Sequence, residues 1–205
     1  MSGPPVSPDV VWQEGEVRRA ERWRAAGVQG ATVWLTGLPG SGKSTLADAL
    51  LAALTSRAVL AYSLDGDNLR HGLNGDLGFS PADRAENVRR VAEVARLCAD
   101  AGVVVAVPVI SPYRAGRAHA RAIHEASGLV FLEVFVDAPL SVCEARDPKG
   151  LYRRARAGEL RGLTGVDGPY EPPADPDLLL ATAELTPADA AARIVAALAA
   201  RGVVA

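Results

Sequence analysis

The run Gly37–Thr45, which reads GLPGSGKST, constrains the fold of this chain more than any other feature. It has the full pattern G-x-x-x-x-G-K-[ST]. An apolar, β-branched run precedes it at residues 31–36, and an Ala/Leu-rich run follows at 46–54. A buried strand, a glycine loop and a helix in this order place backbone N–H groups around phosphate oxygens at a helix N-terminus. The sequence therefore predicts a site for a nucleoside triphosphate.

Strand-like and helix-like segments alternate on both sides of this loop. Further strands are expected at residues 58–64, 103–110, 129–136 and 178–182. Further helices are expected at residues 14–26 and from the capping patterns that begin at Ser80, Ser111 and Thr186. This order is typical of an α/β domain with helices on both faces of a parallel sheet. We predict a three-layer fold with a parallel five-stranded sheet and ligands at the carboxyl ends of its strands.

The composition fits one globular domain. The 205 residues are 49% hydrophobic and 22% charged, and the net charge of −2 argues against a nucleic-acid or membrane partner. The chain has no long apolar run and no basic N-terminus followed by an apolar stretch, so a cytoplasmic location is expected. Cys98 and Cys143 are expected to be reduced thiols. We expect a tail at residues 1–10 and one domain at 11–205.

Two carboxylates follow the second expected strand, in the run Asp65-Gly66-Asp67-Asn68. One carboxylate can accept the proton of a substrate hydroxyl as it attacks phosphorus, and the other can hold a metal-bound water or the substrate. Asp-Gly and Asp-Asn pairs also form turns, so a solvated turn is the alternative. In the glycine loop, Lys43 is expected to reach the phosphates and Ser44 to ligate Mg²⁺.

Polar residues farther along the chain are suited to an anionic second substrate. Arg84 and Asn87 lie three residues apart at the start of an expected helix, and with Arg70 they could hold sulfate or phosphate. The alternative is an exposed, charged helix start. Phe79, in a glycine-rich loop, is either a hydrophobic staple against that helix or a platform for a base.

The basic segment, residues 149–165, contains Lys149 and four arginines against a single acid, Glu159. A segment of this kind can close over phosphates as a lid, where it neutralises charge and excludes water. The alternatives are a solvated basic helix or a nucleic-acid patch. The acidic balance of the rest of the chain disfavours nucleic acid.

Taken together, these motifs resemble the adenosine 5′-phosphosulfate (APS) kinase family. The resemblance covers nearly the whole chain after residue 10. Its Asp-Gly-Asp-Asn, Arg-x-Glu-Asn and Ile-Ser-Pro-Tyr-Arg blocks are much more specific than the phosphate loop. The matching stretches are Gly37–Thr45, Asp65–Asn74, Leu77–Ser80, Arg84–Arg90, Ile110–Arg114, Phe135–Pro139, Arg146–Tyr152 and Tyr170–Pro173. The resemblance implies a P-loop fold with a small basic lid at about residues 149–165.

The resemblance also implies a reaction and a set of site residues. The γ-phosphate of ATP would pass to the 3′-hydroxyl of APS, giving 3′-phosphoadenosine 5′-phosphosulfate and ADP in sulfate activation. Lys43, Asp65 and Ser111 would be catalytic, and Ser44 and Asp65 would hold Mg²⁺. The residues implied to bind ATP are Gly37, Gly40, Ser41, Gly42, Lys43, Ser44, Thr45 and Arg146. Those implied to bind APS are Asp67, Asn68, Arg70, Phe79, Arg84, Asn87, Ile110, Ser111, Lys149, Gly162 and Leu163.

Ser111 has two interpretations. The resemblance implies a phosphoserine site at this position. We favour a helix cap before Pro112 with a substrate contact, because direct in-line transfer needs no enzyme-bound phosphate. The family is usually homodimeric, so a homodimer is implied, with the N-terminal helix as a candidate contact.

Two residues depart from the family pattern. Pro39 stands where the family usually has serine or a small residue, which the loop tolerates. Leu163 stands where the family usually has a phenylalanine that would stack on the APS adenine opposite Phe79. Weaker APS binding is therefore expected, and Leu163→Phe is expected to tighten it.

Two other functions remain open at this point. One is a P-loop kinase for another small acceptor, an alternative that Leu163 favours. The other is a non-catalytic nucleotide-binding regulator. The intact set of Lys43, Ser44, Asp65 and Arg70 argues against the regulator.

Overall fold

Five parallel strands form one sheet in the computed structural model, which describes residues 9–11, 13 and 15–205. The strands are β1 (Ala31–Thr36), β2 (Ala61–Ser63), β3 (Val104–Pro108), β4 (Val130–Asp137) and β5 (Leu178–Ala181). They lie in the order β2-β3-β1-β4-β5, with every neighbouring pair parallel. β1 is central and buried at all six positions, as its apolar, β-branched sequence requires. The predicted parallel five-stranded sheet is confirmed.

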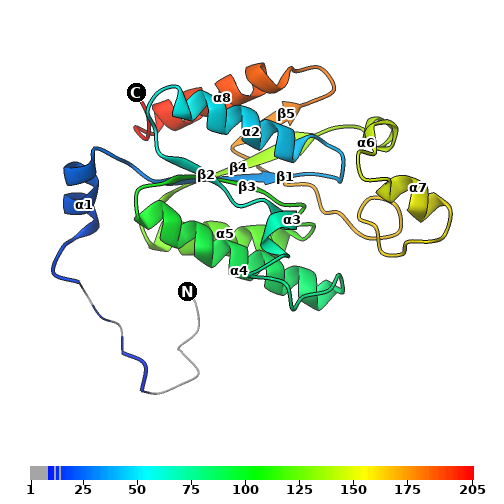
Figure 1. The fold of residues 1–205 in the computed structure, drawn as a ribbon, viewed down its shortest axis with the longest axis horizontal. Coiled ribbons are helices and arrows are strands. Elements are labelled where there is room, and N and C mark those ends of the chain that lie inside the picture. Colours follow the sequence, from blue (N-terminus) through cyan, green and yellow to red (C-terminus); the bar gives the residue numbers. More distant parts are fainter. Residues whose placement is uncertain (1–8, 12, 14) are drawn as a thin grey trace.

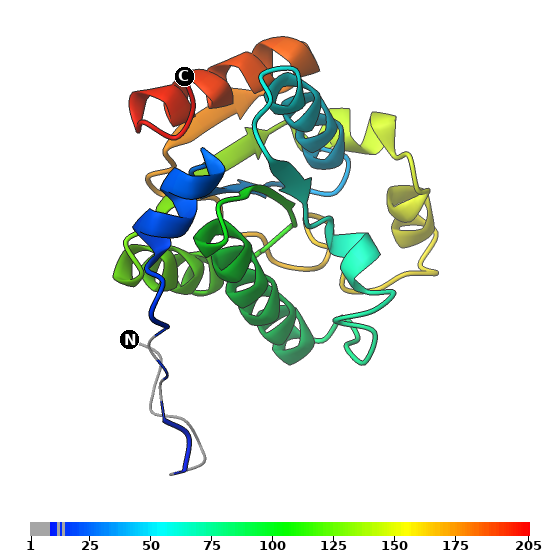
Figure 2. The same ribbon diagram turned by 60° about the vertical axis from the view of Figure 1, so that its left-hand side comes forward.

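Helices cover both faces of the sheet, which gives the predicted three layers (Figure 1). Helices α2 (Lys43–Thr55) and α8 (Pro187–Ala200) pack together on one face, and α4 (Pro81–Asp100) and α5 (Arg114–Ala126) on the other. The remaining helices are α1 (Arg19–Ala26), α3 (Gly66–Leu69), α6 (Leu140–Arg146) and α7 (Leu151–Arg156). Figure 2 shows α6 and α7 together at one end of the sheet, with α1 at the opposite end.

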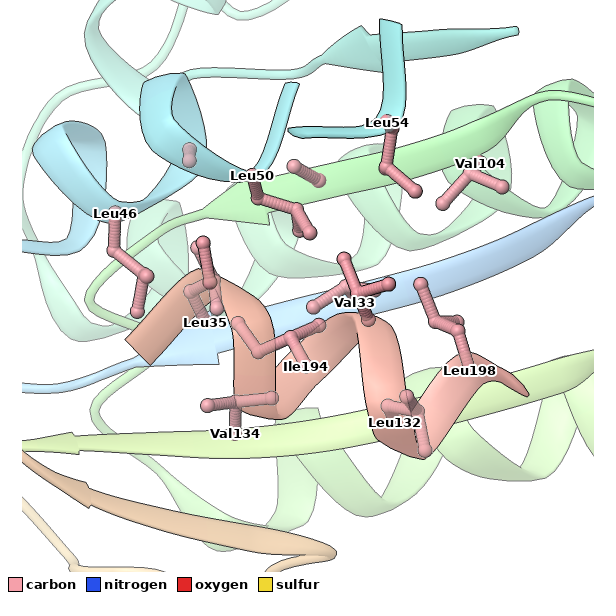
Figure 3. Close-up of a cluster of buried hydrophobic side chains, with 14 of the residues drawn as sticks. Val33, Leu35, Leu46, Leu50, Leu54, Val104, Leu132, Val134, Ile194 and Leu198 are labelled. Carbon is pink, nitrogen blue, oxygen red and sulfur yellow. The ribbon is translucent and has the colours of Figure 1, made fainter. Parts of the chain in front are cut away.

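Side chains that alternate along β1 divide the core into two halves. Val33 and Leu35 point to the α2/α8 face, where they meet Leu50 and Ile194 (Figure 3). Trp34 points the other way and packs in the α4/α5 half. All five side chains are fully buried, and burying one such residue contributes about 1.5–3 kcal/mol. The period of two along β1 therefore supplies apolar contacts to both helical layers.

Two expected elements begin later than predicted. The N-terminal helix begins at Arg19 rather than Glu14, which lies outside the described residues, and Val17 is exposed ahead of it. Its end is as predicted, because Gly27 is left-handed (φ 64°) and caps α1. The second strand is confined to Ala61–Ser63, since Ala58 has a φ of 56° and belongs to the preceding turn. Most of the expected tail, residues 1–8, also lies outside the described residues.

Capping patterns predicted two helix starts and failed at a third. Ser80 and Asp83 form the full capping box of α4. Thr186 caps α8 by accepting from the N–H of Asp189. Ser111 caps nothing: α5 begins at Arg114 after Tyr113, which makes no side-chain capping bond. Within the described residues no helix is both long and apolar enough to cross a membrane.

Candidate active site

A cleft of about 690 Å³ opens at the carboxyl ends of the strands, beside the glycine loop. Parallel strands collect their following loops at one edge, so residues distant in sequence meet there. Most of the predicted site residues line it, namely Gly40, Gly42, Lys43, Ser44, Thr45, Asp65, Asp67, Arg70, Phe79, Arg84, Asn87, Ile110, Ser111, Arg146 and Lys149. The structure thus brings both predicted substrate sets into one cavity.

The glycine loop connects β1 to α2 in a conformation that only glycine fits well. Gly40 is left-handed (φ 74°), and a Cβ there would lie 2.9 Å from the carbonyl oxygen of Cys143. Gly42 (φ 99°) precedes α2, and no side chain caps that helix N-terminus. The first N–H groups of α2 are therefore available to an anion.

Lys43 is buried within the loop at 8% exposure. Its Nζ donates to the carbonyl oxygens of Gly37 at 2.9 Å and Leu38 at 2.7 Å. Burial lowers the pKa of Lys43 to about 7. A phosphate anion would compete with these carbonyls for the ammonium group and favour its charged form.

Asp65 joins the glycine loop to the segment after β2. Its Oδ2 accepts from the Ser44 hydroxyl at 2.8 Å, and its Oδ1 accepts from the N–H of Asp67 at 2.9 Å. The second bond makes Asp65 the N-cap of α3. The Oδ1 of Asp65 therefore stabilises a turn, whereas its Oδ2 contacts the phosphate loop. A hydroxyl and a carboxylate oxygen are hard ligands of the kind that Mg²⁺ takes beside phosphates and water.

Phe79 lines the cleft together with two arginines. The guanidinium carbons of Arg70 and Arg84 lie 4.2 Å and 5.7 Å from the centre of its ring. Phe79 is 67% exposed, which favours a platform for a ligand over a staple against α4. Arg70 donates to the Gly78 carbonyl, and Arg84 donates to the Gly162 carbonyl. Burial, and next the positive charge of Arg84, lower the pKa of Arg70.

Ser111 is held in an unusual conformation beside β3. It is 3% exposed and has a φ of 41°, in the left-handed region that favours glycine. Its Oγ accepts from the indole N–H of Trp34 at 3.0 Å, and its carbonyl accepts from buried Arg117 at 2.6 Å. The Trp34 bond holds the Ser111 hydroxyl toward β1, and α5 begins only at Arg114. Arg117 also donates to Glu133 at 2.7 Å, which satisfies its own buried charge.

The basic segment packs on the glycine loop. Tyr152 in α7 is buried, and its hydroxyl donates to the Pro39 carbonyl at 2.8 Å. Leu163 is also buried, in a cluster with Tyr152 and Cys143 that includes Leu38. Lys149 forms an ion pair with Asp67, so both predicted APS residues contact each other in this structure.

Five predicted residues are not part of the cleft lining: Gly37, Ser41, Asn68, Gly162 and Leu163. Gly37 and Ser41 stabilise the glycine loop through their carbonyl groups. The Gly37 carbonyl accepts from Lys43, and the Ser41 carbonyl accepts from the Thr182 hydroxyl. Asn68 is an exposed residue of α3. Leu163 packs in its cluster and does not line the cleft, whereas Phe79 does, and the expected pairing of the two side chains stays a prediction.

The segment after β5 also lines the cleft, and the sequence did not single it out. Its lining residues are Thr182, Leu185, Thr186 and Pro187. Thr182 donates to the Ser41 carbonyl at 2.7 Å, and Arg146 donates to the Thr182 carbonyl at 2.8 Å. The sequence could have indicated this segment, because Thr182 lies at the carboxyl end of an expected parallel strand and so at the edge of the sheet where ligands bind.

Comparisons with known proteins agree with this geometry. A family model described as adenylylsulphate kinase matches residues 29–181. The adenylyl-sulfate kinase of Yersinia pestis is 58% identical over 172 residues, which cover 84% of this chain and 80% of that protein. The adenylyl-sulfate kinase of Staphylococcus carnosus (strain TM300) is 48% identical over 189 residues, covering 92% and 94%.

A solved structure gives the same assignment. The Mycobacterium tuberculosis APS kinase in complex with AMPPNP and APS superposes with a TM-score of 0.82 at 53% identity, covering 84% of this chain and 99% of that one. The family match spans most of the described chain, and the Yersinia pestis relative and the Mycobacterium tuberculosis structure are each more than half identical to it. This chain belongs to the adenylylsulphate kinase family.

Proposed function

We propose that this protein transfers the γ-phosphate of ATP to the 3′-hydroxyl of APS, forming 3′-phosphoadenosine 5′-phosphosulfate and ADP. The observation that carries this proposal is the cleft, which is lined both by the phosphate loop and by the Arg70–Phe79–Arg84 stack. Two nucleotide substrates need two such groups of residues and a carboxylate at the reacting oxygen. The bond of Asp65 to Ser44 supports Asp65 as that carboxylate.

The chemistry needs one bond to form and one to break. The 3′-oxygen of APS forms a bond to the γ-phosphorus, and the bond from that phosphorus to the β,γ-bridging oxygen breaks, so ADP leaves with the electron pair. Asp65 accepts the hydroxyl proton. Lys43 and the N–H groups at the start of α2 stabilise charge on the phosphoryl oxygens.

The proposed cofactor is Mg²⁺, with the Ser44 hydroxyl and the Asp65 carboxylate as its protein ligands. The cation neutralises charge on the ATP phosphates when it is bound. Among the described residues no group of three His, Cys, Asp or Glu side chains could hold a metal. Two oxygen ligands suit a cation that takes most of its coordination from phosphates and water.

The basic segment is proposed to act as a lid over the cleft, with Lys149 at the APS end. Its bond from Tyr152 to Pro39 supports this role, because it links the segment directly to the phosphate loop.

The domain at residues 11–205, a homodimer and a cytoplasmic location also stay predictions. The free thiols of Cys98 and Cys143 suit a reducing compartment.

A coupled assay of ADP release tests the proposed function. ADP should appear only when ATP and APS are both present, and other small hydroxyl acceptors should give none. Lys43→Ala should abolish the reaction, because the loop lysine neutralises phosphoryl charge. ADP release with another acceptor would support the alternative kinase. Nucleotide binding without turnover on any acceptor would support the regulator.

A further inference from the structure

Two asparagine side chains form a buried pair beside the cleft. Asn74 is fully buried, and its Nδ2 donates to the Oδ1 of Asn87 at 3.1 Å. The Oδ1 of Asn74 has no hydrogen-bond partner in the part of the chain that the structure describes. A buried oxygen without a donor lowers stability, so overall stability does not account for an amide at this position. What the amide contributes is its bond to Asn87.

The loop that carries Asn74 is fixed to α4, the helix that carries Asn87. The N–H of Asn74 donates to the Leu69 carbonyl at 2.9 Å. Arg90, also on α4, donates to the Leu73 carbonyl at 3.1 Å and to the Asp76 carboxylate at 2.7 Å. Contacts on both sides of position 74 therefore hold its side chain against Asn87.

An amide side chain has one acceptor and one donor group, so pairing one end decides what the other end presents. Asn87 lines the cleft, and its Oδ1 is taken by Asn74. Within the described residues the Nδ2 of Asn87 donates to no acceptor. This nitrogen is also not one of the buried unpaired atoms, because the only such atom in the described part of the chain is the Oδ1 of Asn74. The N–H groups of Asn87 are thus the ones that a ligand can reach.

We propose that Asn74 is a positioning residue, which holds the Asn87 amide with its N–H donors toward APS. The inference rests on the proposed function. The substrate affected should be APS rather than ATP. Asn87 follows Arg84 by three residues on α4, and both line the cleft outside the glycine loop. Without Asn74 the amide of Asn87 can turn over and present its oxygen, which cannot bind an acceptor atom of APS.

Two substitutions test this in opposite chemical ways. Asn74→Asp can only accept, so it pairs with the Nδ2 of Asn87 and turns the oxygen toward the cleft. Asn74→Leu removes the pairing together with the unpaired Oδ1 of Asn74, and leaves the Asn87 amide free to turn at the cleft. Each should raise the KM for APS about tenfold, equal to about 1.4 kcal/mol, and change the KM for ATP less than about twofold. The thermal unfolding midpoint of Asn74→Leu should not fall.

Leu73→Ala is the matched control, since its side chain is exposed on the same loop. A double-mutant cycle supplies the decisive readout. In an Asn87→Ala background, Asn74→Leu should raise the KM for APS no more than about twofold further, because the two residues act through one contact. A full tenfold increase in that background would overturn the proposal. So would a wild-type KM for APS in both single variants. Failure of the unaltered protein to consume APS would instead contradict the proposed function.

Discussion

At the scale of single residues, the two carboxylate oxygens of Asp65 have different contacts, one that stabilises α3 and one at the phosphate loop. Its Oδ1 caps α3 through the N–H of Asp67, and its Oδ2 contacts the Ser44 hydroxyl. An asparagine keeps an oxygen for the cap and is an equally good N-cap residue. It lacks the carboxylate that accepts a proton. The two roles can therefore be tested apart.

Asp65→Asn should lower turnover by about 10² or more, because the proton acceptor of the attacking hydroxyl is lost. Nucleotide affinity should largely remain. Steady-state assays and calorimetric titration of ATP measure the two effects. Asp48→Asn, at an exposed position on α2, serves as the control and should retain full turnover. Unchanged turnover in Asp65→Asn would leave Asp65 as a turn and cap residue only.

At the scale of elements, the basic segment shares a small core with α6. Tyr152 and Leu163 of the segment are buried together with Cys143 of α6, and Leu38 of the glycine loop packs against them. The turn that carries Leu163 is held by Asp167, which accepts from the N–H groups of Gly162 and Leu163 at 2.7 and 2.8 Å. Those bonds help to lower the pKa of Asp167. The element therefore fixes where Leu163 lies.

Leu163→Phe is expected from the sequence to tighten APS binding, and the burial of Leu163 adds a cost in stability to that expectation. A larger ring in the buried cluster should cost about 1–3 kcal/mol of folding free energy through overpacking. Thermal denaturation should show a lower midpoint than for Leu97→Phe, a control at an exposed position on α4. An unchanged midpoint with tighter APS binding in calorimetry would show instead that residue 163 turns toward the base.

At the scale of the whole molecule, buried polar contacts tie the sheet to its helical layers. His124 of α5 is fully buried: its Nδ1 lies 2.7 Å from the Ala120 carbonyl, and its Nε2 lies 2.9 Å from the Thr32 hydroxyl of β1. A neutral ring satisfies both contacts, with Nδ1–H donating to the carbonyl. Burial lowers the pKa of His124 below its ordinary 6.5.

This shift gives the folding stability a dependence on pH. The unfolded chain binds the His124 proton more readily than the folded one, so acidification through about pH 6.5 favours unfolding. The stabilising contribution is present above that pH and is lost below it. Denaturant unfolding between about pH 7 and 5 should show a smaller pH slope for His124→Gln than for the wild type. His71→Gln, at an exposed position, should keep the wild-type slope.

Features that depend on a few neighbouring residues could be predicted from the sequence. The glycine loop with its strand and helix, the Ser80 capping box and the Gly27 helix end are set by local backbone geometry and hydrogen bonds. The alternation of strands and helices then determined a parallel sheet. Its ligand edge followed, because loops after parallel strands meet on one side.

Contacts between distant segments were decided only by the tertiary structure. The Trp34 indole takes the Ser111 hydroxyl that appeared free to cap a helix, and the lid cluster takes the Leu163 side chain that appeared free to face a base. The pairing of Asn74 with Asn87 likewise spans two segments. A residue type and its near neighbours define which bonds a side chain can make. The folded chain decides which of those bonds form, because a buried polar group can bond only to the partners that packing places within hydrogen-bond distance.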